Sequence, residues 1–423
     1  MKNISTDVVV VGGGSAGCFA AISAARSGAR VILVEKNGML GGTTTGGMVN
    51  FPGLFHAWGK RIVGGPAWEA IERCVALGGT VLPPFPYKSE HHNKQQILLD
   101  IFTYTCVLDN MCIEAGVQVM FFAMLASATE TKDGVEISVA TKEGLWQINA
   151  KVLIDSTGDA DAIRLAGFEY NTCEVTQPAT LINDIGGYDI EKIDEKNFRK
   201  YIDECYASGM LKKEDFQGHD VYERLKKHRI HMHIPAPYAH TASGRTELEI
   251  RARKTLFNIL KCLSKFEGLE NIHVERFGHE CGVRETVRIS GEAEITAEQY
   301  LSGEIREDSV CYAFYPIDLH RDVDIKQIFL EDGRVPCVSY SNLVPKGSRH
   351  MLVSGRCISS DREANSALRT QAVCMSTGQV AGVAAAICTS RRCDVYEAPM
   401  RLLKDGLHAI GAVVPGDIEF TRT

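Results

Sequence analysis

A strand-like run followed at once by three glycines constrains the fold of this chain more than any other feature. Val8–Val11 is a β-branched run, typical of a central parallel strand that is covered on both faces. Gly12–Gly14 interrupts it, and an Ala-rich stretch with helical character follows over Ser15–Ser27. Arg30–Glu35 then predicts a second strand. The pattern therefore indicates a strand–helix–strand unit that begins near residue 7.

The glycine spacing in this unit is that of a dinucleotide-binding motif. Gly12 permits a tight turn, Gly14 lets the backbone approach a pyrophosphate at the helix N-terminus, and Gly17 permits close packing of helix on sheet. Glu35 lies 18 residues after Gly17, where its carboxylate can accept hydrogen bonds from ribose hydroxyls. A glycine-rich turn without a ligand is the alternative. The contacts predicted in this unit are Gly12, Gly14, Ser15, Ala16, Gly17, Glu35 and Lys36.

Two further features favour FAD over NAD as the dinucleotide. Short strands between Val117 and Asp155 form a meander that leads into Thr157 and Gly158, a layout seen in flavoproteins with two dinucleotide-binding domains. The loop Gly41–Gly47 carries small side chains and free N–H groups that can wrap a pyrophosphate and a flavin ring. A flexible surface loop is the alternative. The contacts predicted here are Gly42, Thr43, Thr44, Thr45, Thr157 and Gly158.

A third feature lies near the C-terminus, in the glycine-containing motifs 354–356 and 376–379. A helix that starts near Gly378 would direct its positive end at the flavin ring and stabilise the anionic reduced form. Ordinary helix packing through Gly378 and Gly382 is the alternative. The contacts predicted in this part of the chain are Gly355, Arg356, Gly378 and Gln379.

Composition excludes several other classes of protein. The chain has 423 residues and a net charge of −7, so no basic excess is present to hold a nucleic acid. None of the 14 cysteines forms a C-x-x-C motif, which argues against a cysteine-ligated cluster and favours reduced thiols in the cytoplasm. Val8–Ala25 is uncharged over 18 residues, but its glycines divide it into a strand and a helix, so we expect no membrane span.

The order of these patterns predicts an α/β fold. We expect a discontinuous, Rossmann-like FAD-binding domain, made of a parallel sheet plus a β-meander, with an inserted mixed α+β substrate domain. The first part of the FAD domain is predicted over 1–170, with a loop or cap segment near 50–92. The ranges predicted for the remainder are 171–340 for the substrate domain, 341–390 for the return of the FAD domain and 391–423 for a C-terminal tail.

Six segments resemble the bacterial FAD-dependent oxidoreductases. They cover 7–36, 40–49, 152–167, 282–292, 315–320 and 343–387, which is most of the chain outside roughly 170–270. The resemblance implies a glutathione-reductase-like FAD domain that is distantly similar to the fumarate reductase flavoproteins. Relatives in that group that bind flavin covalently carry a histidine in the loop matching 40–47. This chain has Thr43, Thr44 and Thr45 there, so the resemblance implies non-covalent FAD.

Candidate catalytic residues lie in two of these segments. Arg284 and Arg288 would share one face of a helix and could clamp a carboxylate, whereas the alternative is ion pairing with nearby glutamates. Asp318 and His320 would lie on the same side of a strand. A histidine beside a flavin can act as an acid or a base, and a structural His–Asp pair is the alternative. We therefore predict Arg284, Arg288 and His320 as catalytic residues.

Two other residue groups are predicted to be structural. The histidines at 228, 231, 233 and 240 match no specific metal-site spacing, so we predict no metal. Cys374 lies beside the predicted flavin helix, and a buried structural thiol is favoured over a redox partner.

The expected enzyme is therefore an FAD-dependent oxidoreductase. It would transfer a hydride between flavin N5 and a small organic substrate. Carboxylate-bearing compounds are among the substrates expected. The alternatives are an NAD-dependent dehydrogenase and a non-catalytic binding protein with an FAD fold. The expected partners are a small-molecule substrate and an electron acceptor that the sequence does not identify. Neither the substrate nor the oligomeric state follows from the sequence.

Overall fold

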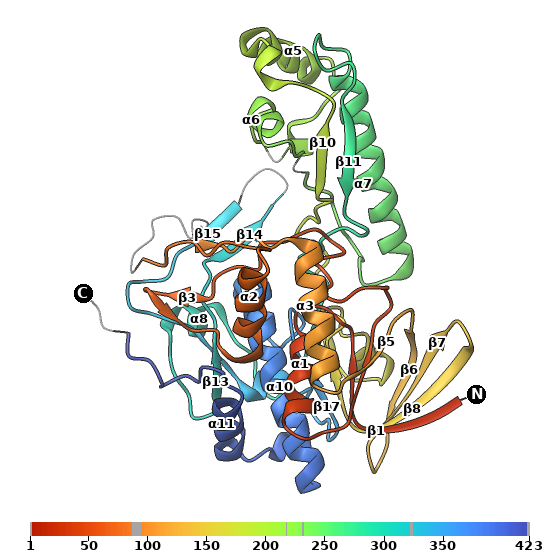
Figure 1. The fold of residues 1–423 in the computed structure, drawn as a ribbon, viewed down its shortest axis with the longest axis vertical. Helices are drawn as coiled ribbons and strands as arrows, with labels where there is room; N and C mark the ends of the chain where they lie inside the picture. Colours follow the sequence, from red (N-terminus) through yellow and green to blue (C-terminus); the bar gives the residue numbers. More distant parts are fainter. Residues whose placement is uncertain (1, 87–94, 217, 231, 322–324, 421–423) are drawn as a thin grey trace.

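The computed structural model describes residues 2–86, 95–216, 218–230, 232–321 and 325–420. Its centre is a sheet of seven strands, which run in the order β5-β2-β1-β8-β7-β6, with β17 paired to β8 (Figure 1). The bounds of these strands are β1 Lys2–Val11, β2 Val31–Val34, β5 Gln118–Met120, β6 Met124–Glu130, β7 Val135–Thr141, β8 Gly144–Asp155 and β17 Met351–Val353.

The sheet combines a parallel part with an antiparallel meander, as predicted. β1 pairs in parallel with both β2 and β8, with Val8 opposite Val31 on one side and Val152 on the other. β6, β7 and β8 pair antiparallel. The sequence pattern predicts two strands over 145–155, but β8 is continuous, and its carboxyl half also pairs in parallel with β17. The expected α/β, Rossmann-like fold is therefore confirmed.

Four helices form a layer beside this sheet (Figure 1). They are α1 Gly17–Arg26, α2 Gly65–Ala76, α3 Ile101–Glu114 and α10 Gln371–Arg391. Among the described residues, α10 alone is long and apolar enough to cross a membrane, but 94% of its most apolar window is buried inside the protein. It packs against α1 and the sheet, so its apolar composition is explained by the core.

A second core lies outside this main body. Apolar side chains between Ala179 and Val283 form their own buried cluster, whereas those from Val287 onward belong to the main core. The elements around the second core are β10 Asn183–Gly186, α5 Glu195–Ala207, α6 Val221–Lys226, α7 Ala242–Leu263 and β11 His273–Phe277. In Figure 1 they project from one end of the main body. This core covers a narrower range than the predicted segment 171–340, whose boundaries stay a prediction.

The remaining elements are short and lie mainly at the edges of the main body. Four of its two-stranded pairings are antiparallel: β3 with β4, β9 with β12, β13 with β16, and β14 with β15. The bounds of the strands are β3 His56–Ala57, β4 Lys60–Arg61, β9 Tyr170–Thr172, β12 Val287–Ile289, β13 Ser309–Tyr312, β14 Ile317–His320, β15 Ile325–Ile328 and β16 Cys337–Ser339. The helices are α4 Asp161–Leu165, α8 Ala297–Ser302, α9 Arg362–Leu368 and α11 Met400–Ala409.

Candidate cofactor and substrate site

The glycine turn between β1 and α1 has the shape that its spacing predicts. Gly12 has a φ of +99°, and a Cβ added there would lie 2.6 Å from the Ser156 carbonyl oxygen. A Cβ on Gly17 would lie 1.7 Å from the Gly12 oxygen, so both positions require glycine for close packing. Gly14 differs, because a Cβ there would meet nothing nearer than Gly42 Cα at 3.9 Å. Its open side, next to a helix N-terminus without a side-chain cap, fits an approaching pyrophosphate.

Glu35 lies directly after β2 with a buried side chain. Its two oxygens accept hydrogen bonds of 2.7 Å from the Gly13 and Asn37 N–H groups. Burial raises the pKa of Glu35, while these two hydrogen bonds act in the opposite direction. A carboxylate has lone pairs beyond these two bonds, so it can also accept ribose hydroxyls. The neighbouring Lys36 turns toward the second core, where its ammonium lies 2.9 Å from Glu280.

The loop Gly41–Gly47 lies against the glycine turn, so it is not a detached surface loop. The Gly41 N–H donates to the Gly13 oxygen over 2.8 Å. The Thr44 hydroxyl lies 3.2 Å from that of Ser15 and hydrogen-bonds the side chain of Gln371. Because Gln371 is the first residue of α10, this threonine joins the loop, the glycine turn and the start of that helix.

Two other predicted threonines stabilise the loop itself. The Thr45 hydroxyl donates to the Leu40 oxygen over 2.6 Å, and the Thr43 carbonyl accepts from the Val49 N–H. Gly42 has a φ of +53°, and a Cβ there would lie 2.8 Å from Gly14 Cα. The loop and the glycine turn therefore approach each other at backbone distance.

Arg356 joins the cofactor side to the second core. Its Nε donates to the Gly158 oxygen over 2.7 Å, and one terminal nitrogen lies 2.6 Å from the Asp159 carboxylate. The other terminal nitrogen donates to the Val283 oxygen. The Thr157 hydroxyl is likewise engaged, since it donates to the Asp155 carboxylate over 2.7 Å. These contacts hold the segment after β8 in place through side chains.

Gly355 allows the chain to turn after β17. It has a φ of +88°, and a Cβ there would lie 3.2 Å from the Ala16 Cβ. Its N–H donates to the hydroxyl of Thr377 on α10. Ala16 itself immediately precedes α1. The turn after β17 is thereby fixed between the start of α1 and the second turn of α10.

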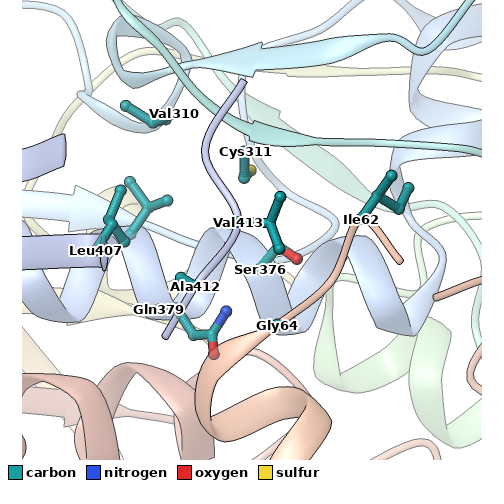
Figure 2. Close-up of a pocket in the computed structure, with 10 residues that line it drawn as sticks. Ile62, Gly64, Val310, Cys311, Ser376, Gln379, Leu407, Ala412 and Val413 are labelled. Carbon is teal, nitrogen blue, oxygen red and sulfur yellow. The ribbon is translucent and has the colours of Figure 1, made fainter. Parts of the chain in front are cut away.

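The expectation of a helix starting near Gly378 is wrong, because α10 begins seven residues earlier, at Gln371. A Cβ on Gly378 would lie 2.1 Å from the Ala16 oxygen, so this glycine lets α10 pack against α1. The Gln379 side chain accepts from the Ala67 N–H in the first turn of α2. Figure 2 shows Gln379 among the residues that line a small pocket, beside Gly64. Both residues serve helix packing, and the N-terminal end of α10 lies at Gln371.

The helix predicted for Arg284 and Arg288 is also wrong. Arg284 lies outside any helix or strand, and Arg288 lies in strand β12. The Arg288 guanidinium lies 3.2 Å from the buried Glu285 carboxylate, and its Nε donates to the Ser360 oxygen. Arg362 binds the same carboxylate over 3.0 Å. The ion-pairing alternative therefore describes Arg288.

Arg284 instead belongs to a polar cluster beside the start of α10. It donates to the Thr180 hydroxyl over 2.9 Å. Burial, and then the positive charge of Arg369, lower the pKa of Arg284 to about 9, while Asp318 acts in the opposite direction. Arg369 lies two residues before α10, and one of its terminal nitrogens is 3.6 Å from the Asp318 carboxylate. The Asp318 carboxylate thus contacts Arg369 and acts electrostatically on Arg284.

His320 completes this cluster. It lies on the same side of β14 as Asp318, as predicted, and its Nε2 is 2.9 Å from the Asp318 carboxylate. Its Nδ1 is 3.2 Å from Nε2 of His233. Burial lowers the pKa of His320 to about 4; Asp318 acts to raise it, whereas Arg284 and Arg369 lower it further. Both ring nitrogens are therefore occupied, and a proton reaches His320 along one of these two bonds.

Two buried donors in this cluster have no hydrogen-bond partner among the described atoms. They are Nε of Arg369 and Nε2 of Gln177. The Gln177 oxygen accepts from the His320 backbone N–H over 3.1 Å, so its amide is fixed in place. Unpaired buried donors are costly, and an acceptor-bearing ligand would satisfy them. Sequence reasoning missed both residues; the available signal was an arginine just before a long apolar helix.

No group of three or more metal-ligating side chains occurs in the part of the chain that the structure describes. His231 of the predicted non-metal group lies outside the described residues. Cys374 is buried, and its thiol points to the backbone oxygen of Arg369 over 3.5 Å. Burial raises the pKa of this thiol to about 12, although Arg356 and Arg369 act to lower it. This environment agrees with a structural thiol.

Comparisons with known proteins identify the family. A short match, 44% identical over 63 residues, is to a thiamine thiazole synthase of Aeropyrum pernix and covers 15% of this chain and 23% of that protein. Among solved structures, a geranylgeranyl bacteriochlorophyll reductase-like protein of Thermoplasma acidophilum is 12% identical, with a TM-score of 0.45 and coverage of 96% of this chain and 83% of that chain. The anhydrotetracycline hydroxylase OxyS of Streptomyces rimosus is 14% identical, with a TM-score of 0.46 and coverage of 96% and 66%.

These similarities are short or low in identity, so the family is identified by a comparison with family models. The model of the FAD dependent oxidoreductase family matches residues 7–407, which is nearly the full length. This match selects the FAD-dependent enzyme over the nicotinamide dehydrogenase and the non-catalytic binding protein. The open glycine turn and the buried Glu35 carboxylate fit the cofactor. The chain belongs to the FAD-dependent oxidoreductase family, and it is an enzyme that uses FAD.

Proposed function

We propose that this enzyme transfers a hydride between FAD and a small carboxylate-bearing organic substrate. The observation that carries the proposal is the cluster before α10, where Arg369 lies 3.6 Å from the Asp318 carboxylate and the charge of the same carboxylate acts on the buried Arg284. Its excess positive charge, together with the unpaired Nε of Arg369, favours an anion that can accept hydrogen bonds. Gln177 would supply a further donor through its unpaired amide nitrogen.

The residues that would hold FAD are those of the glycine turn and its neighbours. Gly14 and the N-terminus of α1 would receive the pyrophosphate, Glu35 would accept the ribose hydroxyls, and the loop Gly41–Gly47 would cover the remainder. When bound, FAD supplies the hydride acceptor or donor, while the protein supplies orientation and proton exchange.

Asp318 and His320 would handle the proton in this reaction. Burial alone would raise the pKa of Asp318, but its hydrogen bond to His320 and the charge of Arg369 hold the pKa well below its ordinary range. Asp318 is thus ionised near neutral pH, and His320 is largely neutral because its pKa is about 4. This pair can accept a proton as the substrate is oxidised and return it in the opposite direction.

The substrate class can be tested with purified holoenzyme under anaerobic conditions. Small carboxylates, each matched with its amide analogue, are mixed with oxidised enzyme, and with reduced enzyme, and flavin absorbance is followed. We expect only carboxylates to bleach the oxidised flavin or to restore the colour of the reduced flavin. Equal reaction of the amides would contradict an anion-binding site.

Arginine variants then separate binding from stability. Arg369→Lys removes the planar bidentate donor, and kcat/KM should fall about tenfold to hundredfold, while flavin content and melting temperature stay normal. Arg288→Lys is the matched contrast: it disturbs the buried pair with Glu285, so flavin content and melting temperature should fall together. Normal turnover in Arg369→Lys would remove that residue from the site.

We also propose that the FAD is held without a covalent bond. The part of the loop expected near the cofactor carries threonines, and Thr44 and Thr45 have buried hydroxyls already engaged by protein groups. No histidine or cysteine lies between Gly41 and Gly47 to form a bond to the flavin. Acid precipitation should release all flavin into the supernatant, and a yellow pellet would contradict this expectation.

A further inference from the structure

His233 lies in the segment that forms the second core, but it contacts the redox site of the main body, by which we mean the cluster of Asp318, His320, Arg284 and Arg369. It follows the buried residue Met232, and its ring meets that of His320 at 76° with centroids 5.2 Å apart. Its Nδ1 lies 3.1 Å from the Arg321 backbone oxygen. Asp318, His320, His233 and that oxygen therefore form one chain with three contacts at hydrogen-bond distance.

The two ends of this chain fix how many protons it can hold. The Arg321 carbonyl is an acceptor, so the His233 Nδ1 must carry a hydrogen for that contact to be a hydrogen bond. The Asp318–His320 contact needs one hydrogen, and the contact between the two rings needs another. Three bridging hydrogens thus complete the chain. Two neutral imidazoles beside an ionised Asp318 supply only two, so the complete chain holds one additional proton.

The charges around the chain decide when that proton is present. The groups that act on His320 are Asp318, which favours the proton, and Arg284 and Arg369, which oppose it. Tyr315 lies close enough to the cluster for burial and Asp318 to raise its pKa to about 12, so it stays neutral. With both arginines unneutralised, the pKa of His320 is about 4 and the additional proton is absent near neutral pH. An anion beside the arginines would remove this opposition.

We infer that His233 is a positioning residue of the redox site, which shares one exchangeable proton with His320 and Asp318, and that this proton is taken up when an anion binds to Arg284 and Arg369. The inference rests on the proposed function for the anion. His233, a residue of the second core, would thus act on the reaction through its contact with His320.

The proton transfer along this chain balances without a further reagent. In the reductive direction, the chain holds its additional proton because the substrate anion is bound, and FAD would supply the hydride. The N–H bond at His320 Nε2 breaks as an O–H bond forms on Asp318, while the hydrogen on His233 Nε2 passes to His320 Nδ1. Asp318 then gives its proton to the substrate and is again ionised, and both imidazoles are neutral. In the oxidative direction the same steps run in reverse, from a chain without the additional proton.

The test uses holoenzyme labelled with nitrogen-15 in histidine and imidazole NMR from pH 4 to pH 8. The probe is sodium acetate at saturation, with acetamide as its uncharged match. We expect acetate, and not acetamide, to raise the pH at which His320 takes up its proton by about one to three units. If His320 titrates at the same pH with and without bound acetate, an anion does not cause uptake of the proton, and the inference is wrong.

Variants then establish the part played by His233. His233→Gln and His233→Asn keep a hydrogen-bonding side chain but cannot share a proton. Acetate still neutralises the arginines in these variants, but the pH at which His320 takes up its proton should lie below the wild-type value in acetate. Flavin content and melting temperature show whether each variant is folded. His408→Gln is the control, because His408 forms an exposed His–Asp pair with Asp417 remote from this chain in sequence and should not alter the titration.

A normal His320 titration in both folded His233 variants would overturn the inference. This failure is distinct from failure of the proposed function. If small carboxylates react with the flavin while acetate leaves the histidines unaffected, only the shared proton is refuted. If no carboxylate reacts with the flavin and acetate does not bind, the anion site itself is refuted.

Discussion

At the scale of single residues, His56 shows how a buried imidazole can make the stability of the enzyme sensitive to acid. Its ring stacks on Phe85 with centroids 3.7 Å apart, and it meets Trp68 edge-on. Its Nδ1 is buried without a hydrogen-bond partner among the described atoms. Burial, and then the charge of Arg61, lower the pKa of His56 from 6.5 to about 4.

The sign of this effect predicts how stability changes with pH. Between pH 6.5 and pH 4 the unfolded chain binds a proton at His56 and the folded chain does not, so stability is lost as the pH falls. His56→Phe keeps the stacked ring and removes the titration. The free energy of unfolding of the variant, relative to wild type, should be about 2 kcal/mol more favourable at pH 5 than at pH 7.5, as measured by urea unfolding. His273→Phe, at an exposed position, is the control; equal pH dependence of wild type and His56→Phe would contradict the prediction.

The candidate site also shows at this scale what a sequence can and cannot indicate. The glycine turn and Glu35 follow from local spacing, because each role depends on neighbours a few residues away. The different roles of Arg284 and Arg288 depend on Glu285, Arg362 and Arg369, which only the fold brings together. The spacing of Arg284 and Arg288 is compatible with a helix, and nothing in the local sequence shows that this segment is not helical. The prediction that both side chains share one helical face could therefore be corrected only by the fold.

At the scale of elements, long periodic segments were predictable and their junctions were not. The sequence patterns predict helices over 191–206, 246–266 and 371–387, and the structure has helices at 195–207, 242–263 and 371–391. The sequence pattern predicts two strands where the structure has the single strand β8. The two halves of β8 have different partners: Ala150 pairs with β7, and Leu153 pairs with β17. α2 lies in the segment expected to be a loop, although Pro66 is suited to the first turn of a helix.

The packing of α10 on α1 gives a prediction at this scale. A Cβ on Gly378 would lie 2.1 Å from the Ala16 backbone oxygen, which cannot move without shifting α1. Gly378→Ala should therefore lower the free energy of unfolding by about 1–3 kcal/mol and reduce flavin content, because Ala16 adjoins the glycine turn. Gly406→Ala in α11 is the matched control, since its Cβ would meet side-chain atoms and no backbone: Val383 Cγ1 at 2.7 Å and Ile387 Cδ1 at 3.8 Å. Similar melting temperatures for the two variants would count against this packing role.

At the scale of the whole molecule, one carboxylate joins the two cores. Asp159 follows β8 in the main body, and it accepts from Arg356 over 2.6 Å and from Arg245 of α7 over 3.0 Å. The Thr286 hydroxyl donates to the same carboxylate. Burial would raise the pKa of Asp159, but Arg356 and Arg245 outweigh it and hold the pKa at about 2. The second core is thereby tied to the segment that the cofactor is expected to contact.

Removing this carboxylate should loosen the second core and weaken FAD binding together. Asp159→Asn leaves two arginines facing a neutral amide, and breaking a buried pair of this kind costs about 3–5 kcal/mol. We expect a lower melting temperature at pH 7, loss of flavin on gel filtration and faster proteolysis within 179–283. Because the folded pKa lies below the unfolded value, the wild-type advantage should shrink as the pH falls from 4 toward 2. Asp394→Asn, whose partner Arg349 is half exposed, should change little. If Asp159→Asn behaves like that control, the two cores are held together by their other contacts.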